Sequence, residues 1–395
     1  MTGNFVTLNE VATFTNGVCF KESDWSEAGS RIIRIQNLTD PKKNYNRTQR
    51  AVPDAVKVHP GDLLVSWSAT LGVFEWGEPD TAVLNQHIFR VEPDLGRVDK
   101  RYLRYAIDRT LKESERHLHG ATMKHVNKGD LLAAKFFAPP VGQQRRVAAV
   151  LDQVDTLRSK RREAIALLDD LARSIFLDMF GDPVANPHGW QRMKMKDFLI
   201  RIDSGKSPQC LDRPAGVGEW GVLKLGAVTK CVYAPGENKA LPGEAVADPR
   251  HEVKQGDLLF TRKNTPDLVA ASVYVRSTPP RLLLPDLIFR LVVREDSLVN
   301  KVFLHHLLTF PAVRKKLQGL ASGSAASMLN ISKAKLLEFE CQIPGSRLQE
   351  DFAIRIEAIE EWRAKHLTHL AALDELFESL QQRAFAGQLW DHEAA

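Results

Sequence analysis

The stretch KQGDLLFTRKNT, residues 254–265, decides how this chain is organised, because most of it occurs twice. Residues 59–70 read HPGDLLVSWSAT, with the same Gly-Asp-Leu-Leu ahead of a strand-like run and a polar loop. Two further phrases recur in the same order: 33–39 corresponds to 223–229, and Ile88-Phe89-Arg90 corresponds to Ile288-Phe289-Arg290. With the segment that follows them, these phrases make four matching stretches in one order, which indicates a tandem duplication.

Beyond these phrases the two halves are related by a constant offset of 205 residues. Identities at this offset link Ala148, Arg158, Lys160, Ala166, Leu168, Asp169, Leu171, Ser174 and Phe180 with Ala353, Arg363, Lys365, Ala371, Leu373, Asp374, Leu376, Ser379 and Phe385. A constant offset predicts an element of fixed length, and the drifting offset before it indicates loops that vary.

The element of fixed length is predicted to be a long helix, at 142–182 and again at 346–387. Apolar residues recur there at steps of three and four, as on one stripe of a helix that pairs with another. The predicted pairing residues are Val147, Leu151, Val154, Ile165, Leu168 and Ile175 in the first helix, and Phe352, Ile356, Ile359, Leu370, Leu373 and Phe377 in the second. The alternative is that each helix packs only on its own domain. Polar residues interrupt both stripes, and we hypothesise that Arg158, Arg161, Arg363 and His366 set the register or meet a partner protein.

The rest of the chain is predicted to be α+β. Short β-rich runs at 31–38, 62–67, 88–91, 222–228, 257–261 and 288–293 alternate with Gly, Pro and Asn loops, and helical patches follow at 100–115 and 300–318. The expected domains are therefore 1–141 and 183–345, each followed by a long helix, with a tail at 388–395.

Composition limits the class of protein. The 395 residues are 44% hydrophobic and 26% charged, with no apolar run long enough to cross a membrane and no secretory signal at the start. Four scattered cysteines without a CxxC pair suggest reduced thiols in a cytoplasmic protein. A net charge of +5 permits binding to nucleic acid.

The sequence lacks a convincing catalytic constellation. Ser204–Ser207, SGKS, resembles the end of a phosphate-binding loop, but Ile200 stands where that loop needs a glycine. Glu252-Val253-Lys254 has nuclease spacing without a convincing upstream Asp. His305 and His306 are not spaced as zinc ligands and are expected on a helix surface. We predict that the chain alone has no catalytic residue and no metal site.

Polar residues in the variable loops suit contacts with DNA. Arg, Asn and Gln can pair with base edges, while Lys and Ser can hold phosphates. The candidates are Arg34, Gln36, Asn37, Ser66, Trp67, Ser68, Asn85, Gln86, Lys124 and His125 in the first copy, and Lys206, Ser207, Lys224, Arg262, Lys263, Asn264, Ser322 and Ser324 in the second. The alternative for each of them is a solvated loop residue.

Three stretches resemble the specificity subunits of type I restriction–modification systems. PPVGQQRRVAAVLDQVDTL at 139–157 and SIFLDMFGDP at 174–183 are similar to that family's central region, and LFESLQQRAFAGQL at 376–389 is similar to its C-terminal end. Trp390 departs from the family pattern, in which Thr is frequent. The Gly-Asp-Leu-Leu phrases and the strand runs resemble the family's target-recognition domains.

The resemblance implies an architecture and a set of partners. Two target-recognition domains would lie at opposite ends of an antiparallel coiled coil, and each would read half of a split, asymmetric DNA site. Two adenine-methyltransferase (modification) subunits would bind this scaffold and supply S-adenosylmethionine, and restriction subunits that use ATP and Mg²⁺ would join them in host defence. Two alternatives remain open: a specificity partner of a fused methyltransferase-nuclease, and a protein scaffold that does not bind DNA.

Overall fold

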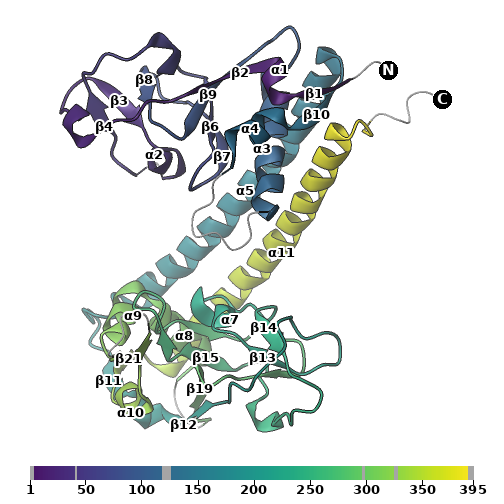
Figure 1. Ribbon diagram of the computed structural model, residues 1–395. Helices are drawn as coiled ribbons and strands as arrows, with labels where there is room; N and C mark the ends of the chain where they lie inside the picture. The colour runs from purple at the N-terminus through teal and green to yellow at the C-terminus, as the bar shows by residue number, and fades with distance from the viewer. Residues whose placement is uncertain (1–3, 41, 118–125, 296–298, 324–327, 390–395) are drawn as a thin grey trace. The chain divides into compact units, whose positions relative to one another are not determined.

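The computed structural model describes residues 4–40, 42–117, 126–295, 299–323 and 328–389, which form an α+β protein in two compact units (Figure 1). Unit 1 contains residues 1–163 and 367–395, and unit 2 contains residues 164–366. Each unit therefore holds one β-rich region together with part of each long helix.

The two long helices have the same length and equivalent ends. Helix α5 runs from Val141 to Phe180 and helix α11 from Ser346 to Phe385, 40 residues each. The first residues of the two helices are therefore 205 positions apart, and so are their last residues, as the offset in the sequence predicts. Gly181 and Gly387 follow the last turns with φ of 73° and 77°, the left-handed conformation that ends many helices. The two predicted long helices are confirmed, and each ends two residues earlier than predicted.

Unit 1 is built on two four-stranded sheets. The first has the order β2-β9-β6-β7 and is antiparallel, and the second has the order β4-β3-β8-β5 with β3 and β8 parallel. Strand β1 pairs with β10. The elements are β1 (Asn4–Thr7), α1 (Leu8–Val11), β2 (Ala12–Asn16), β3 (Ser30–Ile33), α2 (Ile35–Thr39), β4 (Asn46–Thr48), β5 (Lys57–Val58), β6 (Leu63–Ser66), β7 (Gly72–Glu75), β8 (Ala82–Leu84), β9 (Ile88–Pro93), α3 (Lys100–His117), α4 (Lys128–Ala133) and β10 (Lys135–Ala138).

Unit 2 repeats this plan. Its antiparallel sheet has the order β12-β19-β15-β17, a smaller sheet has the order β14-β13-β18, and β11 pairs with β21 and β16 with β20. The elements are β11 (Gln191–Lys194), α6 (Met195–Phe198), β12 (Leu199–Ser204), β13 (Gly221–Leu223), α7 (Gly226–Thr229), β14 (Asn238–Ala240), β15 (Leu258–Thr261), β16 (Lys263–Asn264), β17 (Ser272–Tyr274), β18 (Leu282–Leu283), β19 (Ile288–Val293), α8 (Lys301–Thr309), α9 (Pro311–Gln318), β20 (Leu329–Asn330), α10 (Lys333–Leu337) and β21 (Glu340–Ile343).

The repeated Leu-Leu phrase forms a strand that is buried on both faces. In β6, Leu63 and Val65 enter a cluster that also contains residues of α3, α5 and α11, whereas Leu64 enters a second cluster on the opposite face. In β15, Leu258 and Leu259 divide between two clusters in the same way. Alternate side chains of a strand point to opposite faces, so an unbroken apolar run suits a central strand covered on both sides.

Three of the predicted elements are wrong in detail. The runs 31–38 and 222–228 are strands only at their starts, and they continue as the short helices α2 and α7. In the first, the backbone N–H of Arg34 donates to Oδ1 of Asn37, which closes a helical turn despite the β-rich composition. The single helix predicted at 300–318 is two helices, because Phe310 takes an extended ψ of 128° ahead of Pro311.

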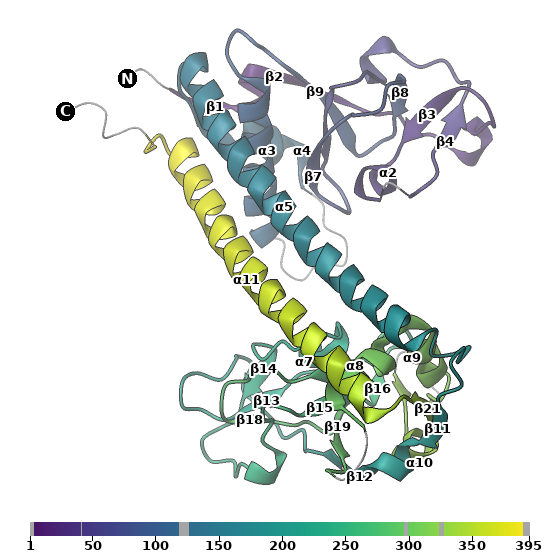
Figure 2. The same cartoon turned by 180° about the vertical axis from the view of Figure 1, so that it is seen from behind.

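The long helices pack on each other and on the β-rich region within each unit (Figures 1 and 2). In unit 1, Val147, Leu151 and Val154 of α5 share one buried cluster with Phe377 of α11 and with strand residues. In unit 2, the Phe352 ring of α11 lies 5.7 Å from the Phe176 ring of α5. The helices therefore pair with each other and also pack on the β-rich regions, so the alternative in which each helix packs only on its own domain is wrong.

The other predicted pairing residues divide by burial. Ile356 and Ile359 are buried in the unit 2 core, and Leu168, Ile175 and Leu373 are partly buried against the core of their own unit. Ile165 and Leu370 are half-buried.

Candidate nucleic-acid interface

The Gly-Asp-Leu-Leu and Ile-Phe-Arg phrases belong to one scaffold. In unit 1, Oδ2 of Asp62 accepts from the backbone N–H of His59 at 2.8 Å and pairs with Nε of Arg90 at 2.7 Å. In unit 2, Oδ2 of Asp257 accepts from the N–H of Lys254 at 2.9 Å, and Arg290 lies 3.3 Å away. In each copy the aspartate stabilises its own turn by accepting a backbone N–H bond, and it is the counter-ion of the arginine on the neighbouring strand.

The loop after this scaffold meets two other loops at Trp67 in unit 1. The Trp67 N–H donates to the carbonyl of His87 at 3.3 Å, and the carbonyl of Trp67 accepts from the N–H of Val126 at 3.1 Å. The indole stacks on Phe89 with ring centroids 5.6 Å apart. Three segments distant in sequence therefore converge, and we name this arrangement the three-loop junction.

Unit 2 has the same three-loop junction with Arg262 in the equivalent place. Its N–H donates to the carbonyl of Leu287 at 3.1 Å, and its carbonyl accepts from the N–H of Ile331 at 2.8 Å. The guanidinium carbon lies 5.0 Å from the ring centroid of Phe289. The backbone frame is therefore repeated, while the side chain it presents changes from indole to guanidinium.

A lysine belongs to each three-loop junction. Nζ of Lys128 lies 5.4 Å from the centroid of Phe89, and Nζ of Lys333 lies 5.6 Å from that of Phe289. The two lysines are 205 residues apart, and each is the first residue of a short helix. They place positive charge at both junctions, and Nζ of Lys333 also donates to the carbonyl of Ile202 at 2.7 Å.

Several candidates of unit 1 already form hydrogen bonds within the protein. Ser66 and Ser68 are buried, and Oγ of Ser66 donates to the carbonyl of Ser68. Asn37 is buried, and its amide donates to the carbonyls of Lys43 and Asn44. These bonds favour structural roles for the three side chains.

The remaining unit 1 candidates differ in exposure. Arg34 is half-buried, and its guanidinium lies 5.7 Å from the Trp25 ring. Gln36 is exposed, and Gln86 is half-buried beside the junction. Asn85 is half-buried, and its Oδ1 has no hydrogen-bond donor among the described residues.

The unit 2 candidates also divide into two groups. Lys206 and Lys224 are exposed, and Lys224 pairs with Glu237 at 2.9 Å. The hydroxyl of Ser207 is bonded to Asp286. Lys263 is half-buried in β16, next to Arg262.

Two further unit 2 candidates have partners inside the protein. Asn264 is buried, and its amide donates to Oγ1 of Thr229 at 3.3 Å. Ser322 is exposed, and its Oγ accepts from Nζ of Lys335 at 3.2 Å. The candidates Lys124, His125 and Ser324 lie outside the described residues.

The SGKS stretch has a structural explanation. A Cβ on Gly205 would lie 1.6 Å from the carbonyl oxygen of Leu284, and a Cβ on Gly17 of unit 1 would lie 2.1 Å from that of Asn85. Both glycines therefore allow one chain segment to cross close to another.

Sequence reasoning missed several residues of this region. Lys128, Lys333, His87 and Asn330 were not predicted, although the constant offset relates the two lysines. It also missed Gln144 of α5, which is fully buried: its side chain donates to the carbonyl of Pro139 at 2.7 Å and accepts from the N–H of Asp99 at 2.8 Å.

The equivalent residue of α11 makes the same pair of contacts. Gln349 is also fully buried, donates to the carbonyl of Pro344 at 2.7 Å and accepts from the N–H of Asn300 at 2.9 Å. These two buried glutamines are 205 residues apart in the sequence. Gln144 joins α5 to the loop before α3, and Gln349 joins α11 to the loop before α8.

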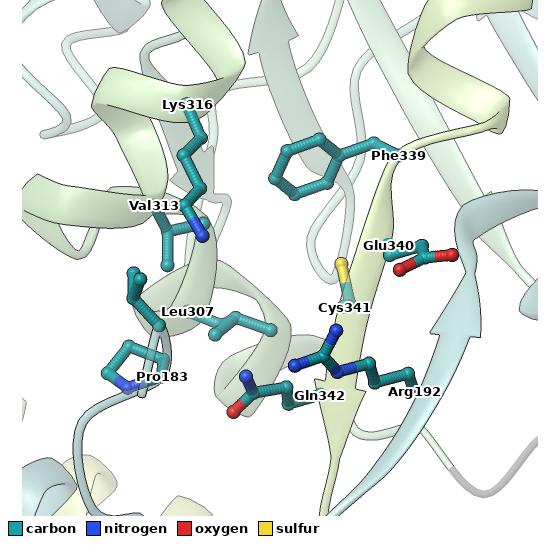
Figure 3. A pocket seen from close by; sticks show the side chains of 10 residues that line it. Pro183, Arg192, Leu307, Val313, Lys316, Phe339, Glu340, Cys341 and Gln342 are labelled. Carbon is teal, nitrogen blue, oxygen red and sulfur yellow. The ribbon is translucent and has the colours of Figure 1, made fainter. Parts of the chain in front are cut away.

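A cavity of about 200 Å³ lies in unit 2, between β11, β21 and the helices α8 and α9 (Figure 3). Arg192, Lys316 and Gln342 contribute polar groups to its lining, and Cys341 lies at its wall. Burial raises the pKa of the Cys341 thiol to about 12, so the thiol stays protonated and is a poor nucleophile. Among the residues in the described ranges, no group of three or more His, Cys, Asp or Glu side chains is placed to hold a metal ion.

The histidine pair is placed differently from the prediction. His305 and His306 are half-buried rather than on an open helix surface, and the His306 ring lies 5.2 Å from Phe352 of α11. Burial lowers the pKa of both imidazoles, that of His306 to about 4. Both rings are therefore neutral at pH 7.

The chain therefore contains two copies of one α+β unit, and each copy has a segment of both long helices and a three-loop junction. A family model described as the type I restriction modification DNA specificity domain matches residues 3–167. The type I restriction enzyme EcoEI specificity subunit of Escherichia coli is 32% identical over 168 residues, which cover 42% of this chain and 28% of that protein.

Two further proteins match nearly the whole chain. The type I restriction enzyme EcoBI specificity subunit of Escherichia coli is 23% identical over 427 residues of alignment, covering 97% of this chain and 85% of the relative. The crystal structure of the type I restriction-modification system S subunit from M. genitalium shares the fold, with a TM-score of 0.57, 12% identity, and coverage of 97% of this chain and 96% of that one. The family model thus matches the N-terminal part of this chain, and nearly the whole chain is similar to a type I restriction enzyme specificity subunit. Within the ranges that the structure describes, no helix is long and apolar enough to span a membrane.

Proposed function

We propose that this chain is the DNA-recognition subunit of a type I restriction–modification complex, and that it reads a bipartite, asymmetric site with one half-site per unit. The observation that carries this proposal is the repeated three-loop junction, whose backbone bonds are equivalent while Trp67 in one copy is replaced by Arg262 in the other. A shared frame with different side chains is what two different half-sites require.

Lys128 and Lys333 support a nucleic-acid ligand, because each brings a cation to its junction. The chain itself would catalyse nothing. S-adenosylmethionine would be bound by the modification subunits, and ATP with Mg²⁺ by the restriction subunits.

Recruitment of two modification subunits is supported by exposed apolar residues on the long helices. Leu157 and Leu171 of α5 are 46% and 45% exposed, and Trp362 and Leu376 of α11, at the equivalent positions, are 58% and 46% exposed. Large apolar side chains that recur in solvent at duplicated positions suit two copies of one partner.

The partner contact can be tested by native mass spectrometry of the assembled complex. Trp362→Asp should weaken the binding of one of the two modification subunits. Leu95→Asp is the control, because Leu95 is 66% exposed and belongs to neither long helix. Unchanged stoichiometry in the Trp362 variant, even at dissociating concentrations, would count against this docking surface.

DNA recognition is tested by co-expressing the chain with its adenine methyltransferase in a methylation-free host and mapping every modified adenine. A two-part motif with a fixed gap is the expected result. A continuous motif would contradict the two-unit assignment. If an assembled complex with a competent methyltransferase produces no methylation, a protein-binding scaffold becomes the better account.

A further inference from the structure

Arg262 is held in a defined orientation before any ligand arrives. Its Nε donates to Oδ1 of Asn330 at 3.0 Å, and its guanidinium lies over the Phe289 ring at 5.0 Å. Its backbone N–H and carbonyl are both bonded within the three-loop junction. One edge of the guanidinium and one of its faces are therefore fixed by the protein.

The residue that orients Arg262 is itself well anchored. Asn330 exchanges backbone hydrogen bonds with Ser322, at 3.0 Å in both directions, and it lies opposite Lys263 in the β16–β20 pair. A side-chain amide on paired backbone has little freedom, so Asn330 acts as a positioning residue for Arg262.

The other edge of the guanidinium is available. Among the residues that the structure describes, Nη1 and Nη2 of Arg262 have no hydrogen-bond acceptor. Two parallel N–H donors match N7 and O6 of guanine in the major groove, the pairing most often made by arginine with a base. A phosphate also accepts such a fork. The half-buried, pre-oriented side chain favours a base, and the neighbouring Lys263 is better suited to a phosphate.

Unit 1 lacks this device. Trp67 occupies the equivalent position, and its indole N–H donates to Oδ1 of Asn16 at 3.3 Å. An indole has no second donor and no acceptor, so it cannot pair with N7 and O6 together.

We propose that Arg262, oriented by Asn330, is the specificity-determining residue that reads a guanine in the half-site of unit 2, and that unit 1 has no equivalent guanine contact. This inference rests on the proposed function and names one of its base contacts.

The test uses the complete complex with the adenine methyltransferase and compares methylation motifs. Arg262→Lys keeps the charge and removes the fork, so one guanine in one half of the motif should become degenerate, with a loss of discrimination of roughly 5- to 150-fold. Asn330→Ala should relax the same position by a smaller factor. Lys316→Ala, which removes an exposed cation elsewhere in unit 2, should leave the motif unchanged.

Each outcome separates this inference from the proposed function. If the wild-type complex gives no bipartite motif, the proposed function itself fails. If the wild-type complex gives a bipartite motif and Arg262→Lys leaves every position of that motif unchanged, the guanine assignment is overturned. It is also overturned if Arg262→Lys weakens methylation equally at all sites, because that is the effect of losing a phosphate contact. If Arg262→Lys does not assemble, Asn330→Ala decides by the same criterion.

Discussion

In unit 1, Arg158 of α5 donates from Nε to Oδ1 of Asp374 in α11 at 2.6 Å. In unit 2 the arginine lies on α11 and the aspartate on α5: Arg363 donates from Nε to Oδ1 of Asp169 at 3.1 Å. The two arginines are 205 residues apart, and so are the two aspartates. The repeated segment therefore carries one arginine and one aspartate, and its two copies form two ion pairs. This recurrence fits antiparallel pairing of the two helices within each unit.

We expect Arg158→Leu to destabilise unit 1 by about 1–2 kcal/mol, because the side chain is only 14% exposed and also lies 4.3 Å from the Phe377 ring. Arg162→Leu is the matched control: Arg162 contacts the same Asp374 at 3.2 Å but is 51% exposed, so its loss should cost below about 0.5 kcal/mol. Thermal unfolding of the assembled complex measures both. Equal midpoints for the two variants would show that Arg158 does not set the register.

Gly205→Ala should destabilise unit 2 by roughly 3 kcal/mol or prevent its folding, because the added Cβ would lie 1.6 Å from the carbonyl oxygen of Leu284. Gly236→Ala provides the comparison, since a Cβ there meets nothing within 4 Å. Chemical unfolding and limited proteolysis of the two variants test this. A Gly205→Ala protein as stable as Gly236→Ala would mean that the segments do not cross as closely as the structure shows.

Arg290→Met should destabilise unit 2 by roughly 3–5 kcal/mol. The guanidinium lies 3.1 Å from Asp203 and 3.3 Å from Asp257 and donates to the carbonyls of Glu252 and Arg250. Its removal takes the counter-ion from Asp257 and leaves Asp203 with the more exposed Arg201 as its remaining ion-pair partner. Arg250→Met, at an exposed side chain, should change the unfolding free energy little. A small effect at position 290 would contradict the scaffold role of the two repeated phrases.

The stability of unit 2 should fall as the pH is lowered from about 6.5 towards about 4. Burial, with a smaller effect of Arg276, lowers the pKa of His306 to about 4, and that of His305 also lies well below its usual range. An unfolded chain protonates its imidazoles near pH 6.5, so below that pH the unfolded state binds more protons and is favoured. Melting curves across this range measure the effect, and His306→Phe should reduce the slope. A slope equal to the wild type in that variant would assign the effect to other groups.

The duplication, the long helices and the paired phrases could be predicted from sequence, because each leaves a periodic or repeated signal. The helix α2 could not, because its composition is β-rich and only the bond between Arg34 and Asn37 shows why a helical turn closes there. The three-loop junction also escaped prediction. Residues 67, 87 and 126 are far apart in the chain, and only their backbone hydrogen bonds bring them together.

The burial of candidate side chains was equally inaccessible to pattern reasoning. Asn37, Ser66 and Asn264 have the chemistry to contact DNA, yet each satisfies a polar group inside the protein. A residue type states which bonds are possible, whereas the fold determines which of them are already made.

The central claim, that the two units read separate half-sites, is tested most directly by exchanging residues 183–345 for the equivalent domain of a relative with a different methylation motif. The chimaera would be assembled with the methyltransferase, and its modified adenines would be mapped. The account predicts that one half of the motif changes to that of the relative while the other half and its adenine stay the same. A motif that changes in both halves, or in neither, would contradict it.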